Sequence, residues 1–142
     1  MKKIVCITGG MGSGKSTVAR FLLEADFAVY NSDTRAKELM LEEPVRGQIE
    51  HLLGPSVYLN NGALNRQFLA DQIFTYPKKK SALEAIVHPA VRVDFEHWLE
   101  QAKGPVVFKE SALTLEIEDN SCTTVLLVDC PVSTRFQRVK QR

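Results

Sequence analysis

The chain has 142 residues, enough to bury a hydrophobic core in one domain, and its 44% hydrophobic and 25% charged residues are typical of a soluble globular protein. Its formal net charge of +1 gives no indication of binding to nucleic acid or to a membrane surface. No apolar run approaches the ~18 residues that a membrane-spanning helix needs, and the apolar run near the N-terminus is too short for a signal peptide.

The predicted elements alternate between strands and helices. In chain order, the apolar patterns predict a strand over 4–7, a helix over 17–24, a strand over 27–30, helices over 32–42, 45–53, 65–74 and 81–101, strands over 106–108 and 124–128, and a helix from 135. Ser32 or Asp33 could cap the second helix. Pro89 predicts a kink or a new start within the helix over 81–101. The last two strands show no alternation, so both are expected to be buried on both faces.

This order of elements predicts an α/β fold of three layers, with a parallel sheet flanked by helices. In such sheets, ligands bind at the carboxyl ends of the strands. Asp33, Lys109, Glu110 and Asp129 all come just after a predicted strand. We therefore expect these four side chains to lie at one edge of the sheet.

A phosphate-binding motif joins the first predicted strand to the first predicted helix. Gly9, Gly14, Lys15 and Ser16 satisfy the pattern G-x-x-x-x-G-K-[ST]. Glycines allow backbone N–H groups to turn toward an anion, and the start of the helix adds its positive dipole end. Lys15 is expected to contact the terminal phosphates of a nucleoside triphosphate, and the Ser16 hydroxyl to bind Mg²⁺. The residues predicted to bind the nucleotide are Gly10, Met11, Gly12, Ser13, Gly14, Lys15, Ser16 and Thr17.

The motif alone identifies the ligand class and leaves the reaction open. The chain contains neither the N/T-K-x-D segment nor the D-x-x-G segment of a switch GTPase, and no signature of a transporter or a motor ATPase is found. These observations favour a small phosphotransferase.

Several segments together resemble the dephospho-CoA kinase family. Residues 8–17 (TGGMGSGKST) are similar to the family signature T-G-G-[IM]-G-S-G-K-S-T. Colinear similarities follow at 29–33 (VYNSD), 61–66 (NGALNR), 73–74 (IF) and 83–89 (LEAIVHP). The chain departs from the family pattern at Asn31 and Asn65, where the family has aspartates. Residues 110–113 (ESAL) stand where the family has a hydrophobic segment similar to P-L-L-F-E. The chain departs from the family pattern again at 114–118 (TLEIE), which lacks the family's usual L-F-E-[AS]-G.

The resemblance implies ATP-dependent phosphorylation of the ribose 3′-hydroxyl of dephospho-CoA, which gives CoA and ADP in the last step of coenzyme A biosynthesis. It implies a P-loop NTPase fold in which residues 1–142 form a single kinase domain. A mostly helical acceptor-binding region would span about 31–103, and a C-terminal lid with the last elements would follow Arg142. Two alternatives stay open: another small-molecule kinase, of the nucleoside monophosphate or shikimate type, and a non-catalytic nucleotide-binding module.

Candidate roles can be assigned to individual residues. Asp33, with Lys15, is the candidate catalytic group, because its carboxylate could accept the proton of the acceptor hydroxyl; its local alternative is a helix cap. The resemblance assigns Arg66, His88 and Arg92 to the acceptor site, together with Asp33. Locally these three could equally be a solvated helix-end cation, a structural histidine before a proline and a surface residue. Glu110 could contact Mg²⁺ through water or be a plain charge at a strand end.

The cysteines indicate a reducing compartment. Cys6, Cys122 and Cys130 are odd in number, widely spaced and set mostly among apolar neighbours. This pattern predicts reduced core thiols in a cytoplasmic protein rather than disulfides or a zinc site. The only expected partner is the substrate dephospho-CoA, with no nucleic acid and no membrane, and the oligomeric state is left open.

Overall fold

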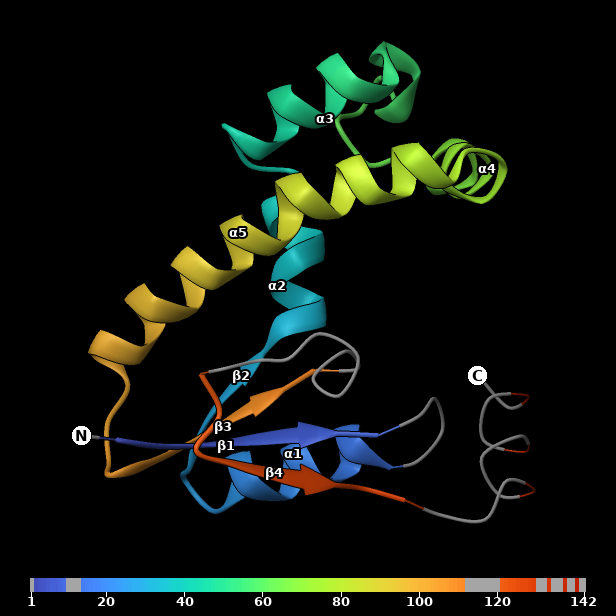
Figure 1. Cartoon of the computed structure of the whole chain (residues 1–142). Helices are drawn as coiled ribbons and strands as arrows, with labels where there is room; N and C mark the ends of the chain where they lie inside the picture. The colour runs from blue at the N-terminus through green and yellow to red at the C-terminus, as the bar shows by residue number, and fades with distance from the viewer. Residues whose placement is uncertain are drawn as a thin grey trace. The chain divides into compact units, whose positions relative to one another are not determined.

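The computed structural model describes residues 2–9, 14–111 and 121–129, with Ser133, Gln137 and Lys140 near the C-terminus. The elements are β1 (Lys3–Thr8), α1 (Lys15–Glu24), β2 (Ala28–Asn31), α2 (Ser32–Leu39), α3 (Val45–Leu53), the 3₁₀ helix η1 (Pro55–Val57), α4 (Arg66–Thr75), α5 (Pro77–Gln101), β3 (Val106–Glu110) and β4 (Thr124–Leu127) (Figure 1). The predicted strands and helices up to residue 128 are confirmed, with shifted bounds. The helix expected from 135 lies largely outside the described residues.

The longest helix differs most from its prediction. α5 begins at Pro77, because proline at the first helical position lacks only an N–H that would have no partner there. It then continues without interruption through Pro89, so of the two alternatives predicted at that proline, a kink or a new start, the new start is wrong. Among the described residues, no helix has the length and apolar character that crossing a membrane requires.

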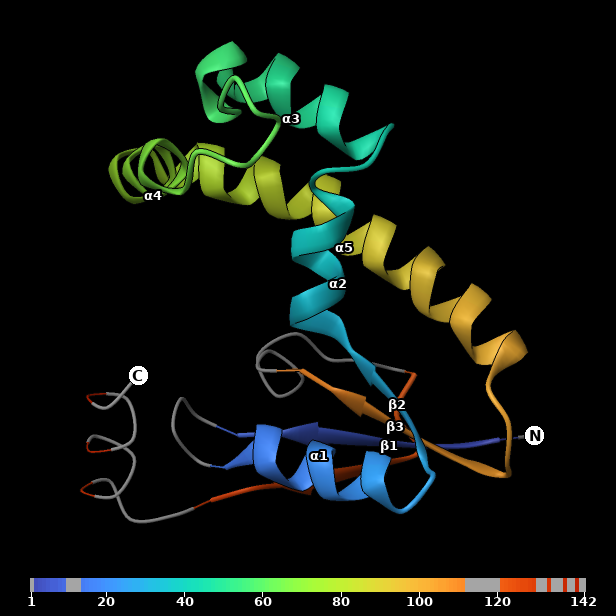
Figure 2. The same cartoon turned by 180° about the vertical axis from the view of Figure 1, so that it is seen from behind.

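The strands form one parallel sheet in the order β2-β3-β1-β4. Ile7 of β1 and Asn31 of β2 are both register partners of Glu110 in β3, so the three residues lie side by side at the carboxyl edge. α1 lies along one face of the sheet (Figure 2). The predicted parallel sheet with flanking helices is confirmed.

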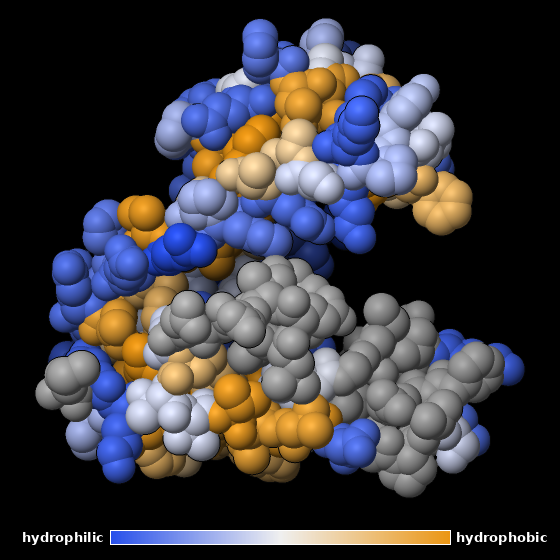
Figure 3. All heavy atoms as spheres, viewed as in Figure 1, coloured by the Kyte–Doolittle hydropathy of each residue, from blue (hydrophilic) through white to orange (hydrophobic). Residues whose placement is uncertain are grey.

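Two expectations about the later strands are wrong. Lys109 and Glu110 are the last residues of β3 rather than residues beyond it. All four residues of β4 are exposed, although this strand was expected to be buried on both faces. β4 pairs only with β1 among the described strands, so it forms an edge, and its apolar side chains appear at the surface in Figure 3.

A disulfide between Cys6 and Cys122 contradicts the expectation of reduced thiols for these two residues. Parallel pairing of β1 with β4 places the chain just before β4 alongside β1, where the Thr123 N–H donates to the Ile4 carbonyl at 2.8 Å. Residues 116 positions apart in the sequence therefore come within a Cα–Cα distance of 5.7 Å. Sequence spacing alone carries no information about this proximity.

The chain divides into two compact units. The sheet unit is formed by Met1–Asp33 and His97–Arg142, and the helical unit by Thr34–Glu96. The core of the helical unit consists of Met40, Val45, Ile49, Leu53, Val57, Tyr58, Leu83 and Val87.

The Tyr58 hydroxyl donates to the Met40 carbonyl, and burial raises the pKa of Tyr58. This tyrosine therefore stays neutral at physiological pH and keeps its proton for that hydrogen bond.

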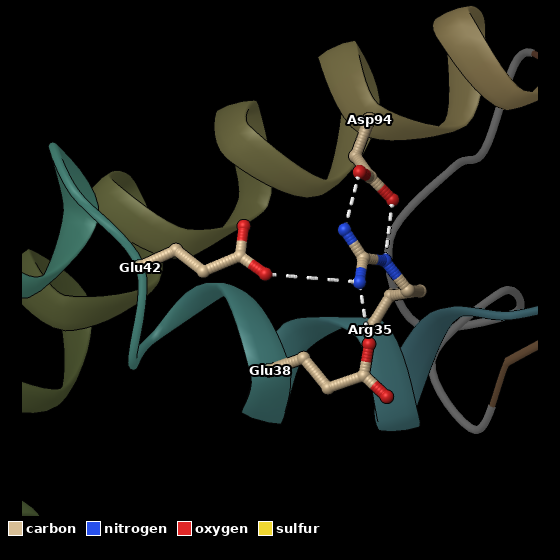
Figure 4. A network of polar contacts seen from close by, with 4 residues as sticks. All are labelled: Arg35, Glu38, Glu42 and Asp94. Atoms are coloured by element: carbon tan, nitrogen blue, oxygen red, sulfur yellow. Dashed lines mark hydrogen bonds and ion pairs between the residues drawn. The ribbon is translucent and has the colours of Figure 1, made fainter.

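A charged network joins α2 to α5 within the helical unit (Figure 4). Nε and Nη2 of Arg35 donate to the two carboxylate oxygens of Asp94 at 2.9 and 2.7 Å. Nη1 of Arg35 donates to Glu38 and lies 3.9 Å from the Glu42 carboxylate. The hydrogen bonds to Asp94 and, to a smaller extent, to Glu38 raise the pKa of Arg35 above its ordinary value. Two parallel bonds to one carboxylate fix both distance and orientation, so this pair holds α2 against α5.

We expect Arg35→Ala and Asp94→Ala each to lower the free energy of unfolding by about 1.5–3 kcal/mol, as for hydrogen bonds between charged groups that are partly buried. Urea denaturation of the two single variants and the double variant would give the coupling free energy between Arg35 and Asp94. The exposed pair Arg20–Glu24, with Nε 3.9 Å from Oε1, is the matched control, and its coupling should be close to zero. Equal coupling for the two pairs would contradict the assignment.

Candidate functional site

The junction between β1 and α1 has the geometry of an anion-binding site. Gly14 precedes α1 with a φ of +105°, a conformation that side chains disfavour, so glycine is required there. No side chain of the described residues caps the N-terminus of α1. Its free N–H groups and positive dipole end are therefore available to a phosphate group. Four of the predicted nucleotide-binding residues lie outside the described residues: Gly10, Met11, Gly12 and Ser13.

The next three motif residues open the helix. Lys15 is half-buried, and its ammonium group makes no hydrogen bond or ion pair with any other described residue. Ser16 and Thr17 are exposed. An ammonium group without a protein partner beside a helix N-terminus can neutralise phosphate oxygens.

A hydrogen-bonded group of three side chains adjoins this junction. The Ser16 hydroxyl donates to Oε1 of Glu110 at 3.1 Å. The Asn31 amide donates to Oε2 of the same carboxylate at 3.0 Å. Glu110 is only 4% exposed, so its charge is buried and both of its oxygens accept a hydrogen bond.

The sequence predicted Glu110 at this edge of the sheet but did not identify its hydrogen bonds to Ser16 and Asn31. Its place directly after an apolar run was the available signal, and that signal could not separate a functional carboxylate from a plain strand-end charge. The decisive information is the register that sets Glu110 opposite Asn31, which depends on strand pairing far along the chain.

Asp33 lies in the first turn of α2, directly after β2, at the same edge of the sheet as Glu110. Its half-buried carboxylate makes no hydrogen bond or ion pair with the described residues. Ser32 also does not act as a cap, because its buried hydroxyl has no hydrogen-bond partner. The predicted helix cap is therefore absent from the described contacts, and the Asp33 carboxylate is available for another role.

The other three candidate residues belong to the helical unit. Arg66 is the first residue of α4, which the Asn65 side chain caps by accepting from the Phe68 N–H at 3.2 Å. Asparagine caps helices about as well as aspartate, so Asn65 preserves this function. His88 and Arg92 lie one turn apart on α5 and share a face. No hydrogen bond or ion pair joins these three to each other or to other described residues, and both arginines are exposed.

The donor set at the Ser16 end suits a hard cation. A hydroxyl and a nearby carboxylate offer oxygen ligands of the kind that Mg²⁺ prefers. Within the described ranges, no group of three His, Cys, Asp or Glu side chains could hold a metal ion by itself. A cation at this position would therefore take most of its ligands from phosphate oxygens and water. Asp129 is exposed, just beyond the end of β4.

The strand–helix junction lies at the carboxyl edge of a parallel sheet, is preceded by a glycine, and has a lysine and a serine that open the helix. These features are typical of a P-loop nucleotide-binding protein. The sequence model of the dephospho-CoA kinase family matches residues 3–142. The chain belongs to the dephospho-CoA kinase family. Its reaction is the ATP-dependent last step of coenzyme A biosynthesis.

Individual relatives agree with this assignment. The chain is 41% identical over 138 residues to the dephospho-CoA kinase of Porphyromonas gingivalis, covering 96% of this chain and 68% of that protein. It is 33% identical over 144 residues to the Escherichia coli K12 dephospho-CoA kinase, covering 100% and 70%. The chain thus spans about two thirds of the length of these relatives.

Solved structures show the same fold. The crystal structure of TT1252 from Thermus thermophilus superimposes with a TM-score of 0.88 at 35% identity, covering 99% of this chain and 72% of that one. A dephospho-CoA kinase from Campylobacter jejuni has a TM-score of 0.65 at 16% identity, a likeness of fold alone.

Proposed function

We propose that this chain transfers the γ-phosphoryl group of Mg²⁺-bound ATP to the ribose 3′-hydroxyl of dephospho-CoA. The observation that carries the proposal is the uncapped start of α1, where Lys15 has no protein partner among the described residues and Ser16 is hydrogen-bonded to a buried carboxylate. Phosphoryl transfer requires mainly positioning of the two reactants and neutralisation of charge. This arrangement supplies both on the donor side.

On the donor side, the backbone of the loop and the start of α1 bind the β-phosphate, while Lys15 reaches the β- and γ-phosphates. The Ser16 hydroxyl, which donates to the Glu110 carboxylate, would hold Mg²⁺. Bound there, Mg²⁺ would neutralise negative charge on the phosphate groups. The nucleotide-binding residues are those proposed from the motif, 10–17.

On the acceptor side, Asp33 accepts the proton of the attacking 3′-hydroxyl or orients that group. Its carboxylate lies at the carboxyl edge of the sheet and has no partner among the described residues, so it is free to receive a hydrogen bond from substrate. Arg66, His88 and Arg92 bind the anionic dephospho-CoA. Guanidinium groups that make no ion pair with described residues can pair with phosphate oxygens without first breaking a contact.

An assay of ADP release with a panel of acceptors tests the function. The protein should turn over with dephospho-CoA and show no turnover with nucleoside monophosphates or shikimate. The product should be CoA, and phosphorus NMR should show the new phosphate at the ribose 3′ position. Turnover with the other acceptors alone would refute the proposal.

Asp33→Asn should lower kcat by about 10²–10⁴-fold, since it removes the proton acceptor while keeping the shape of the side chain. The affinity for ATP, measured by calorimetry, should stay unchanged. Asp71→Asn is the matched control, because Asp71 is exposed and its contact with the Gln67 amide survives the change. A near-wild-type rate for Asp33→Asn would rule out the role.

Arg66→Ala should raise KM for dephospho-CoA by about 10–100-fold, as expected for the loss of a charge-assisted hydrogen bond. KM for ATP should not change, because Arg66 lies on α4, outside the phosphate-binding junction. Lys37→Ala removes an exposed cation elsewhere in the helical unit and serves as the control. If Arg66→Ala and Lys37→Ala change KM for dephospho-CoA equally, Arg66 does not bind the acceptor.

A further inference from the structure

The buried carboxylate of Glu110 connects two elements of the sheet unit. It accepts from the Ser16 hydroxyl, which comes from α1, and from the Asn31 amide, which comes from β2. Asn31 and Glu110 are register partners on adjacent parallel strands, which lie about 4.8 Å apart. Asn31 is also a place where this chain departs from the family pattern.

The direction of the Ser16 hydrogen bond decides what its oxygen can bind. A hydroxyl has one proton to donate and two lone pairs that accept. An ionised carboxylate only accepts, so the Ser16 proton must point toward Glu110. The lone pairs of Ser16 then face away from Glu110 and are free for a cation.

Asn31 determines which way the carboxylate faces. Its amide occupies Oε2, which leaves Oε1 directed at Ser16. An acidic side chain at position 31 would instead place two like charges at the distance between neighbouring strands and provide no donor for Oε2. A neutral donor beside the carboxylate is therefore what this geometry requires.

We propose that Asn31 and Glu110 are a matched amide–carboxylate pair that orients the Ser16 hydroxyl toward the metal–nucleotide complex. Both are positioning residues, since they act through Ser16. The inference rests on the proposed role of Ser16 as a Mg²⁺ ligand.

The test measures ADP binding by calorimetry with Mg²⁺ and with EDTA, using the whole chain. The ratio of the two affinities reports the contribution of the metal without requiring turnover. Glu110→Gln should lower this ratio about tenfold, because Asn31 holds the carbonyl of Gln and leaves its NH₂ group to occupy the Ser16 lone pair. Asn31→Leu should lower the ratio in the same direction, since the carboxylate keeps its charge and loses its fixed orientation. Affinity in EDTA should remain unchanged for both variants.

The double variant Asn31→Asp with Glu110→Gln tests whether the pair acts by orienting the Ser16 hydroxyl. It does so because it exchanges the donor and the acceptor of the pair. The NH₂ group of Gln would donate to the aspartate, and its carbonyl would again accept from Ser16. The ratio should therefore return to within about threefold of the wild-type value. Glu100→Gln, an exposed change in the sheet unit, is the control and should leave the ratio unaltered. Thermal melts followed by circular dichroism would confirm that each variant folds.

An unchanged ratio for Glu110→Gln would overturn the proposal, and so would a folded double variant that shows no recovery. Ser16→Ala distinguishes this failure from that of the proposed function. A lowered ratio for Ser16→Ala with an unchanged ratio for Glu110→Gln would overturn the paired role alone. An unchanged ratio for Ser16→Ala would refute both the metal-ligand role of Ser16 and the pair that depends on it. If Glu110→Gln does not fold, the ratio of ADP affinities with Mg²⁺ and with EDTA is compared between Asn31→Leu and the wild type. An unchanged ratio for Asn31→Leu would then overturn the proposal.

Discussion

Parallel pairing brings Asn31, Glu110 and Ile7 into register at the carboxyl edge of the sheet, and the proposed nucleotide-binding site depends on that alignment. A shift of one residue in β3 would turn Glu110 to the opposite face. Ser16 and Asn31 would then lose their shared acceptor. The register is held by backbone hydrogen bonds and by the fully buried side chains of Cys6, Ile7 and Val107, which pack in the interior of the sheet unit.

The features that depend on local sequence could be predicted. The phosphate-binding motif required a strand before it and a helix after it, and β1 and α1 supply both. Short apolar runs predicted the strands and helices up to β4, because burial in a three-layer fold imposes patterns that extend over only a few residues. Lys15 and Ser16 followed from the same local motif. The candidate roles of Asp33, Arg66, His88 and Arg92 stay predictions.

The features that depend on contacts between distant segments could not be predicted. The Cys6–Cys122 disulfide and the hydrogen bonds of Glu110 to Ser16 and Asn31 result from strand pairing across more than half of the chain. An apolar run such as β4 looks the same in the sequence whether it lies inside a sheet or at its edge. Pro89 fits within α5 because a long helix can lose one backbone hydrogen bond and continue, which composition does not reveal.

The start of α2 shows how the demands of fold and site differ. Ser32 and Asp33 are residues that commonly cap helices, yet neither makes a cap in the described contacts, and the buried Ser32 hydroxyl lacks any partner. An unpaired buried hydroxyl costs about 1 kcal/mol or more. The helix has only eight residues, too few to be stable by itself. The bidentate contact of Arg35 with Asp94, two residues beyond Asp33, supplies the missing stabilisation from α5. Because this contact fixes the helix, Asp33 can leave its carboxylate unpaired and available to substrate.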